Sequence, residues 1–276
     1  MASLSDKLKS LGVKVGTANL PKPAVENRFE IDTVVSGSYR SGRAGETFVS
    51  EQIFETDYHH GQAAILPGAS FDALAEWAHE RRFQELPLEA YAFLDTETSG
   101  LAGGTGTYAF LVGVGRFFPK EAGVIPEMKT EPAKAEAMEF RLQQFFMRDP
   151  AEEAALLENL TDFLAPCQAL VTFNGKGFDA PLLATRYAMH DIPCPFSDYA
   201  HLDLLPLARR LWRDRLPSRA LKFLEENVLG APRTVDDNPR VSGDLVRKSH
   251  DNLIDVHPAL QAIEPNAETV LRSIEM

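Results

Sequence analysis

The sequence predicts an α/β domain in which helices flank a mixed β-sheet. Short segments that are apolar or alternate between apolar and polar residues are typical of strands. Further along the chain, strand-like segments alternate with segments whose apolar residues recur at helical spacing. With 276 residues and 44% hydrophobic content, the chain is long enough to bury the core that such a sheet needs.

The chain divides into an N-terminal arm and a main domain. Residues 1–45 are expected to form a helix and a flexible arm, because residues 3–12 are amphipathic and residues 13–45 are rich in Gly, Pro, Ser and Asn. Residues 46–276 are expected to form the main domain. Its first half carries strands expected at residues 46–57, 91–96, 107–116 and 139–146, with a helix expected at residues 71–83.

The second half begins with a clear helix. Residues 150–164 have apolar residues at helical spacing and acids in the first turn, where the helix dipole favours them, and Pro166 follows the end. Two more strands and three more helices are expected, the strands at 169–173 and 201–205 and the helices at 180–190, 206–213 and 218–228.

Composition excludes several classes of protein. No apolar run approaches the ~20 residues of a membrane span, and the N-terminus lacks the apolar segment of a secretory signal. Cys167 and Cys194 have neither metal-site nor disulfide-framework spacing, so we expect a reduced, cytoplasmic protein. The net charge of -12 argues against a general nucleic-acid coat protein.

The charge is unevenly distributed. The segment from Arg209 to Lys248 carries ten Lys or Arg and six Asp or Glu, which gives +4 there and leaves -16 for the remainder. Two interpretations are open, namely a solvated helix face or one wall of a groove that binds a phosphate backbone.

Two acids lie at the carboxyl end of an apolar strand. Asp95 and Glu97 follow the run Tyr91-Ala92-Phe93-Leu94, and side chains at i and i+2 of a strand point to the same face. Open α/β sheets place their sites at this end of the strands. Two carboxylates this close repel each other unless a cation lies between them, and Mg²⁺ or Mn²⁺ prefers oxygen ligands. The pair is therefore a candidate metal site, although surface acids also occur with this spacing.

A third acid follows a strand and a turn in the segment TFNGKGFDAP, residues 172–181. Asp179 stands where the next helix should begin. It could be the N-cap of that helix, with Pro181 in the first turn. It could also be a third metal-binding carboxylate, and the two interpretations are compatible.

The glycine-rich run between the expected strands at 91–96 and 107–116 has three possible roles. Gly103, Gly104 and Thr105 lie in it, but the run lacks the lysine of a phosphate-binding loop and does not open a helix. It either lets backbone amides approach a nucleotide closely, which glycine permits, or simply links two strands. Three aromatic residues are candidates for base stacking or for the core: Tyr108, Phe178 and Trp212.

Together, these motifs resemble a known family. Phe93-Leu94-Asp95-Thr96-Glu97-Thr98, the run from Leu101 to Gly113, and Asn174-Gly175-x-x-Phe178-Asp179-x-Pro181 are similar to the DEDD superfamily of 3′-5′ exonucleases. The closer similarity is to its YprB-like branch of ribonuclease H-like domain proteins, which shares the 101–113 run, His201-Leu202-Asp203-Leu204-Leu205 and Arg209-Arg210-Leu211-Trp212. The similarity extends over residues 46–260, and it implies a ribonuclease H-like mixed sheet.

The resemblance also implies a last carboxylate near the C-terminus with a histidine upstream. His250 and Asp255 match the His-x-x-x-x-Asp spacing of the histidine-bearing DEDD subgroup. The YprB-like pattern reads His-Asn-x-x-Asp, so Asp251 is inserted in this chain, and Pro258 follows where the family has a continuous apolar helix.

The implied activity is metal-dependent 3′-5′ exonuclease hydrolysis of single-stranded DNA or RNA. Two Mg²⁺ or Mn²⁺ ions, ~3.5–4 Å apart, would activate a water and stabilise the leaving oxygen, with His250 as general base. The implied metal ligands are Asp95, Glu97, Asp179 and Asp255. The expected substrate contacts are Thr98, Gly103, Gly104, Thr105, Asn174 and Phe178.

Three other functions are compatible with parts of the pattern. A phosphohydrolase of the haloacid type needs an aspartate two positions after the first, where this chain has Glu97. A ribonuclease H-type endonuclease would share the fold and metals but attack internal bonds. A catalytically silent nucleic-acid-binding module would bind a strand without turnover.

Overall fold

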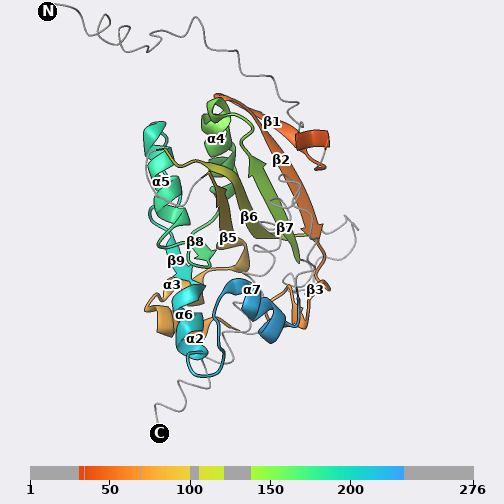
Figure 1. The fold of residues 1–276 in the computed structure, drawn as a ribbon, viewed down its shortest axis with the longest axis vertical. Coiled ribbons are helices and arrows are strands. Elements are labelled where there is room, and N and C mark those ends of the chain that lie inside the picture. Colours follow the sequence, from red (N-terminus) through yellow and green to blue (C-terminus); the bar gives the residue numbers. More distant parts are fainter. Residues whose placement is uncertain (1–30, 34, 69, 100–105, 121–137, 233–276) are drawn as a thin grey trace, which may run out of the picture.

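The predicted α/β fold with a mixed sheet is confirmed. The computed structural model describes residues 31–33, 35–68, 70–99, 106–120 and 138–232 (Figure 1). Its centre is a seven-stranded sheet in the order β1-β2-β7-β6-β5-β8-β9. The strands are β1 (Ser38–Gly42), β2 (Gly45–Phe54), β5 (Tyr91–Thr98), β6 (Ala109–Pro119), β7 (Met138–Phe146), β8 (Ala169–Thr172) and β9 (Ala200–Asp203).

Strand direction divides the sheet into two parts. From β1 to β5 every neighbouring pair is antiparallel, whereas β5, β8 and β9 are parallel to one another. The carboxyl ends of these three parallel strands therefore meet at one edge of the sheet. This edge receives the acids of β5, the turn that follows β8 and the last residue of β9.

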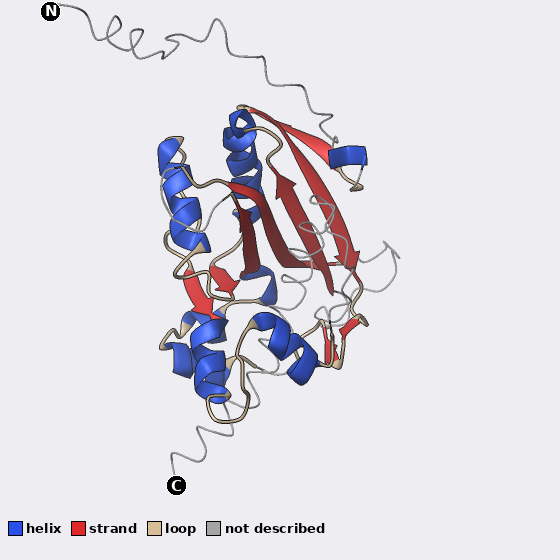
Figure 2. Cartoon of the chain, in the orientation of Figure 1, coloured by secondary structure: helices blue, strands red, loops and turns tan. Residues whose placement is uncertain are grey.

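Helices cover both faces of the sheet, as Figure 2 shows. On one face α4 (Glu153–Leu164) and α5 (Asp179–Met189) pack against alternate residues of β5 such as Ala92 and Leu94. On the other face the residues of β5 that point the opposite way pack with four helices. These are α2 (Asp72–Ala78), α3 (Arg82–Glu85), α6 (Leu204–Leu211) and α7 (Leu221–Leu224).

Short elements complete the described part of the chain. They are the 3-10 turns Ile31–Thr33, Leu88–Ala90 and Pro150–Glu152, the two-residue strands β3 (His59–His60) and β4 (Ala63–Ala64), and the π-helical turn Glu225–Leu229.

Several expected elements end earlier than the sequence pattern indicates. The helix expected at 71–83 is divided, because His79 adopts a left-handed conformation (φ 53°) that ends α2. The strand expected at 201–205 stops at Asp203, whose carboxylate accepts a hydrogen bond from the Leu205 amide and begins α6. The helix expected at 218–228 is α7 followed by the π-helical turn.

Part of the expected N-terminal arm belongs to the sheet. Residues 38–42, inside the segment expected to be a linker, form β1 and pair with β2 from Ser38↔Val49 to Gly42↔Gly45. Gly45 takes the turn at a φ of 130°, which favours glycine. The glycine that signals a flexible linker is here a hairpin residue, so the composition was misleading. The helix expected at residues 3–12 lies outside the described residues.

A buried ion pair holds α5 against α4. Arg186 Nε of α5 donates to Glu153 Oε1 of α4 at 2.6 Å, and both side chains are 3% exposed. His190 Nε2 lies 2.7 Å from Glu153 Oε2, and the Arg186 guanidinium stacks on the ring of Tyr108 at 4.3 Å. Because Asp179 is the first residue of α5, this cluster also fixes where that carboxylate lies.

Glu153→Gln is expected to lower the free energy of unfolding by about 3–5 kcal/mol, because it leaves the Arg186 charge buried without a counter-ion. The neighbouring Glu152→Gln is the matched control. Glu152 pairs with Arg148 at the surface, so its loss should cost less than ~1 kcal/mol. Urea denaturation, monitored by circular dichroism, measures the free energy of unfolding of both variants. Equal decreases would contradict the stabilising role of the buried Arg186–Glu153 pair.

Candidate functional site

The strand β5 delivers two acids to the edge where the parallel strands end. Tyr91 to Leu94 are buried, Asp95 is half-buried and Glu97 is 9% exposed. The strand extends two residues beyond its expected end at 96, and its pairing with β6 shifts register between Glu97 and Thr98. Asp95 and Glu97 therefore lie on one face at the carboxyl end of β5, where the sequence placed them.

Asp179 approaches the same edge from α5. It is not the N-cap of the helix, which corrects one interpretation drawn from the sequence. Phe178 is the N-cap residue, and no side chain caps the helix. The buried Asp179 carboxylate instead accepts a hydrogen bond from the Thr96 hydroxyl of β5. The third candidate carboxylate is thus held directly against the strand that carries the other two.

Gly175 makes this approach possible. A Cβ at this position would lie 2.6 Å from Thr172 Cβ and 2.8 Å from Asp179 Oδ2. Its carbonyl also accepts a hydrogen bond from the Ala180 amide at 2.9 Å, which begins α5 without a side-chain cap. Glycine is required here because the backbone passes so close to the carboxylate.

The environment of Asp179 disfavours the ionised form of its carboxyl group. The pKa of Asp179 is raised to about 6, mainly by burial and in smaller part by the charges of Asp203 and Glu97, while the Thr96 hydrogen bond acts in the opposite direction. The carboxylates therefore lie within electrostatic reach of one another. Such a set of oxygen donors suits a hard divalent cation, which would compensate the repulsion.

Asp203 has a structural role in this arrangement. Its carboxylate accepts hydrogen bonds from the Asn174 amide at 2.8 Å, the Lys176 amide at 3.1 Å and the Leu205 amide at 3.1 Å. It therefore caps α6 and also holds the turn after β8, in which Asn174 has a left-handed φ of 72°. Capping α6 and holding this turn are the roles for which Asp203 has direct contacts.

His201 of β9 is a titratable residue next to the candidate site that sequence reasoning did not select. Its Nε2 lies 3.0 Å from the Thr172 hydroxyl, and burial together with the Lys176 charge lowers the pKa of His201 to about 4. The imidazole is therefore neutral at neutral pH. The signal available in the sequence was His201-x-Asp203, which places both side chains on one face of β9.

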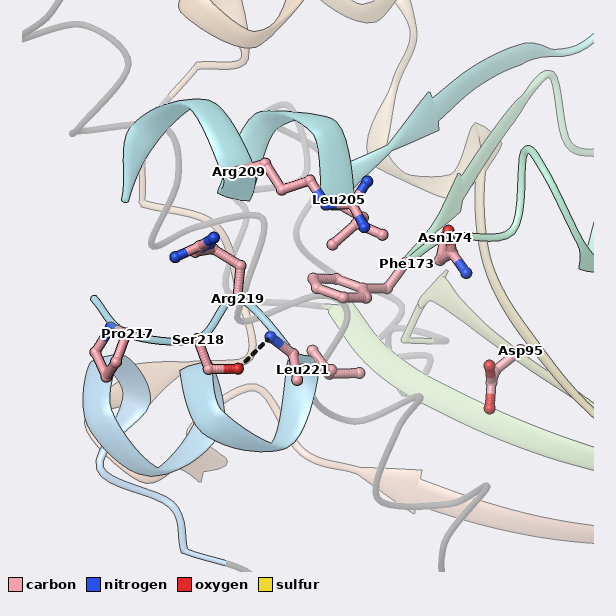
Figure 3. Close-up of a pocket in the computed structure, with 10 residues that line it drawn as sticks. Asp95, Phe173, Asn174, Leu205, Arg209, Pro217, Ser218, Arg219 and Leu221 are labelled. Atoms are coloured by element: carbon pink, nitrogen blue, oxygen red, sulfur yellow. Dashed lines mark hydrogen bonds between the residues drawn. The ribbon is translucent and has the colours of Figure 1, made fainter. Parts of the chain in front are cut away.

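A cleft of about 530 Å³ opens beside Asp95. Its described lining is Asp95, Phe173, Asn174, Leu205, Arg209, Pro217, Ser218, Arg219, Ala220 and Leu221. In Figure 3, Asp95 lies at one side and Arg219 at the other, and the Phe173 ring lies between them with the Arg209 guanidinium beside it. The start of the basic segment thus forms a cleft wall. Phe173 and Arg219 were not individually predicted.

The remaining predicted residues fall into three groups. Thr98 and Phe178 are half-buried near the edge but do not line the cleft, and Trp212 is 6% exposed and packs in the core. Gly103, Gly104, Thr105, His250 and Asp255 lie outside the described residues. Within the described ranges, no group of three or more His, Cys, Asp or Glu side chains is arranged to hold one metal ion.

Comparisons with known proteins identify the family of this chain. A family model described as RNase_H superfamily matches residues 92–249, more than half of the chain. The chain belongs to the RNase H superfamily. The matched range begins within β5 and includes Asp95, Glu97 and Asp179.

A curated relative narrows the branch of the RNase H superfamily. The chain is 33% identical over 150 residues to "Uncharacterized protein YprB" of Bacillus subtilis (strain 168), and the match covers 53% of this chain and 31% of the relative. The chain therefore carries a YprB-like RNase H-like domain and spans about a third of the length of that relative. The predicted YprB-like ribonuclease H-like family is confirmed.

Membership in the RNase H superfamily points to a nuclease-type activity, to nucleic acid as partner and to divalent metals, which such nucleases generally use. Across the residues that the structure describes, no helix is long and apolar enough to cross a membrane.

The pKa of Asp179 gives a pH-dependent signature in EDTA. Between about pH 4 and pH 6 the folded protein holds a proton on Asp179 that the unfolded chain has lost, so the stability contribution of this group falls as pH rises. The Asp179→Asn variant has no ionisable group at this position, so its stability should not fall with rising pH for this reason. We expect the variant to be more stable than the unsubstituted protein by about 2–3 kcal/mol at pH 7.5, and by much less at pH 4.

Thermal and urea unfolding at both pH values measure the difference. Asp162→Asn, at an exposed position of α4, should change the free energy of unfolding by no more than ~0.5 kcal/mol at either pH. A destabilised Asp179→Asn protein at pH 7.5 would show that the ionised carboxylate is compensated within the protein itself.

Proposed function

We propose that this chain is a metal-dependent 3′-5′ exonuclease that hydrolyses phosphodiester bonds of single-stranded nucleic acid. The observation that carries the proposal is that Asp95, Glu97 and Asp179 all lie at the edge formed by β5, β8 and β9. Three segments that are distant in sequence build this edge, and the pKa of Asp179 responds to the charge of Glu97.

The donor chemistry of the edge fits divalent metal ions. Asp95, Glu97 and Asp179 would hold Mg²⁺ or Mn²⁺ together with Asp255, which the resemblance supplies as the fourth ligand. When bound, such ions make water more acidic and stabilise the negative charge on the leaving oxygen. In the structure, the Asp179 carboxylate is hydrogen-bonded to Thr96, so that it would have to exchange this contact for the ion.

The residues of this chain position the strand and move the proton. The arginines of the cleft attract the phosphate backbone, and the turn held by Asp203 presents Asn174 beside Asp95. His250 would take the proton of the attacking water, a role suited to a group that titrates near neutrality. His201 does not suit this role, because its Nε2 is engaged with Thr172 and its pKa is lowered to about 4.

An endonuclease of ribonuclease H type is the second candidate. The match to the RNase H superfamily model favours it, because an endonuclease of this type would share the fold and the metals. The polarity of digestion separates the two activities, because an exonuclease needs a free 3′ end whereas an endonuclease cuts a strand whose 3′ end is blocked.

The purified full chain with Mn²⁺ is expected to shorten 5′-labelled single-stranded DNA or RNA from the 3′ end, and EDTA should stop the reaction. Asp95→Asn should reduce the rate at least ~100-fold, because the site loses a ligand for the ions that stabilise the transition state. Asp162→Asn serves as the matched control and should retain the full rate.

Denaturing gels of timed digests show the outcome. A 3′-blocked strand that is cut internally would favour the endonuclease. An Asp95→Asn protein with full metal-dependent activity would refute the proposed site, and binding without cleavage of either strand would indicate the silent binding module.

A further inference from the structure

We infer that the cleft beside Asp95 is a subsite for the nucleotide next to the scissile bond, in which Arg209 and Arg219 bind the neighbouring, uncleaved phosphodiester. The inference rests on the proposed function, because it takes the scissile phosphate to lie at Asp95. It adds a substrate requirement, namely a single strand that continues beyond the scissile bond and carries a charged phosphate at the next linkage.

Arg219 has hydrogen-bonding capacity that the protein does not use. Its Nη1 donates to the carbonyl of Leu216 at 2.9 Å, which fixes the guanidinium, whereas its buried Nε has no hydrogen-bond partner. A buried donor without an acceptor is costly, and guanidinium groups bind phosphate through paired N–H donors. The Arg219 guanidinium at the cleft wall is therefore held in place without a carboxylate or other anion of the described protein to balance it.

The charge around the two arginines supports the same ligand. Among the residues that the structure describes, neither Arg209 nor Arg219 forms a salt bridge with a carboxylate. Other basic residues of this region are engaged differently. Arg210, for example, stacks on the ring of Trp77 at 4.5 Å. The positive charge that faces the cleft thus comes from one residue of α6 and one residue that precedes α7.

The order of groups across the cleft matches one nucleotide unit. Figure 3 shows the Asp95 carboxylate at one side, the Phe173 ring with the Arg209 guanidinium beside it in the middle, and the Arg219 guanidinium at the far side. Phe173 offers a face for a base or sugar, and Leu205 and Leu221 add apolar walls. A scissile phosphate at Asp95 would therefore be followed by a base or sugar at Phe173 and by the next phosphate at the arginines.

The size and openness of the cleft favour an internal diester of a single strand. A volume of about 530 Å³ lies within the ~300–1,000 Å³ usual for small-ligand sites, which accommodates a nucleotide but not a duplex. Arg209 is exposed, so a strand can leave the cleft into solvent at this end. A terminal phosphate is the competing ligand, and the experiment below includes it.

The test neutralises one phosphate at a time. A 5′-labelled oligonucleotide carries a single methylphosphonate, which lacks the negative charge, either at the linkage adjacent to the scissile one or four linkages away. With the unsubstituted protein, we expect the adjacent substitution to lower kcat/KM by about 10- to 100-fold, because charged hydrogen bonds are lost. The distant substitution should change it less than about 3-fold.

The arginine variants and the modified oligonucleotides together form a double-mutant cycle. In Arg209→Gln/Arg219→Gln, the adjacent methylphosphonate should no longer matter beyond about 3-fold, because the groups that sense the charge are absent. Arg219→Lys keeps the charge but not the guanidinium fork, and should show an intermediate effect. Arg213→Gln, at an exposed position outside the cleft lining, is the matched control and should behave like the unsubstituted protein.

Binding measured without turnover separates this inference from the proposed function. Fluorescence anisotropy in Ca²⁺ compares the same oligonucleotides with the same variants. If binding in Ca²⁺ depends on the adjacent phosphate through the arginines but no strand is cut in Mn²⁺, the subsite stands and the nuclease proposal fails. If strands are cut and the adjacent phosphate has no effect, the nuclease stands and the subsite is refuted.

Two further outcomes also refute the subsite. If the protein binds a terminal phosphomonoester more tightly than an internal diester, and this preference depends on Arg209 and Arg219, the terminal phosphate is the ligand of the cleft. Absence of both binding and cleavage would overturn the subsite together with the nuclease proposal.

Discussion

The parallel pairing of β5, β8 and β9 determines where the site residues that these strands carry come together. Because three parallel strands end at the same edge, β5 brings Asp95 and Glu97 there, β8 brings the turn with Asn174, and β9 brings Asp203. Antiparallel pairing at either position would send one of these groups to the opposite edge. The rest of the fold, including the hairpin β1–β2, extends and covers this arrangement.

Placing a carboxylate at this edge is unfavourable in the absence of a cation. Asp179 is 5% exposed, and its neighbours include other acids, so its ionised form is disfavoured. The buried Arg186–Glu153 pair and the Thr96 hydrogen bond hold the carboxylate in place despite this cost. Such a strained but well-supported acid is typical of a binding or catalytic site, where stability is given up for function.

Much of the fold and part of the site could be predicted from sequence. Strands such as β5 and β8 were found because short apolar runs end in polar residues, and the acids of β5 follow from strand periodicity. The ends of elements were less predictable, because His79 and Asp203 stop their segments through a local conformation and a cap. β1 was missed because glycines that make a hairpin turn have the same composition as a linker.

The cleft could not be predicted because it depends on tertiary contacts. Phe173 looks like an ordinary strand residue, and the position of Arg219 depends on how the segment between α6 and α7 folds back towards β8. The sequence indicated a basic segment but not which of its arginines face Asp95. The same holds for Asp179, whose spacing fits a helix cap although its hydrogen bond goes to β5.

The central claim is that the carboxylates at this edge bind divalent cations. Calorimetric titration of the full chain with Mn²⁺ at pH 7.5 tests it most directly and does not depend on finding the natural substrate. We expect saturable binding in the unsubstituted protein and in Asp162→Asn, and its loss or strong weakening in Asp95→Asn and Asp179→Asn. Binding that is unchanged in both site variants, or absent from the unsubstituted protein, would contradict the account.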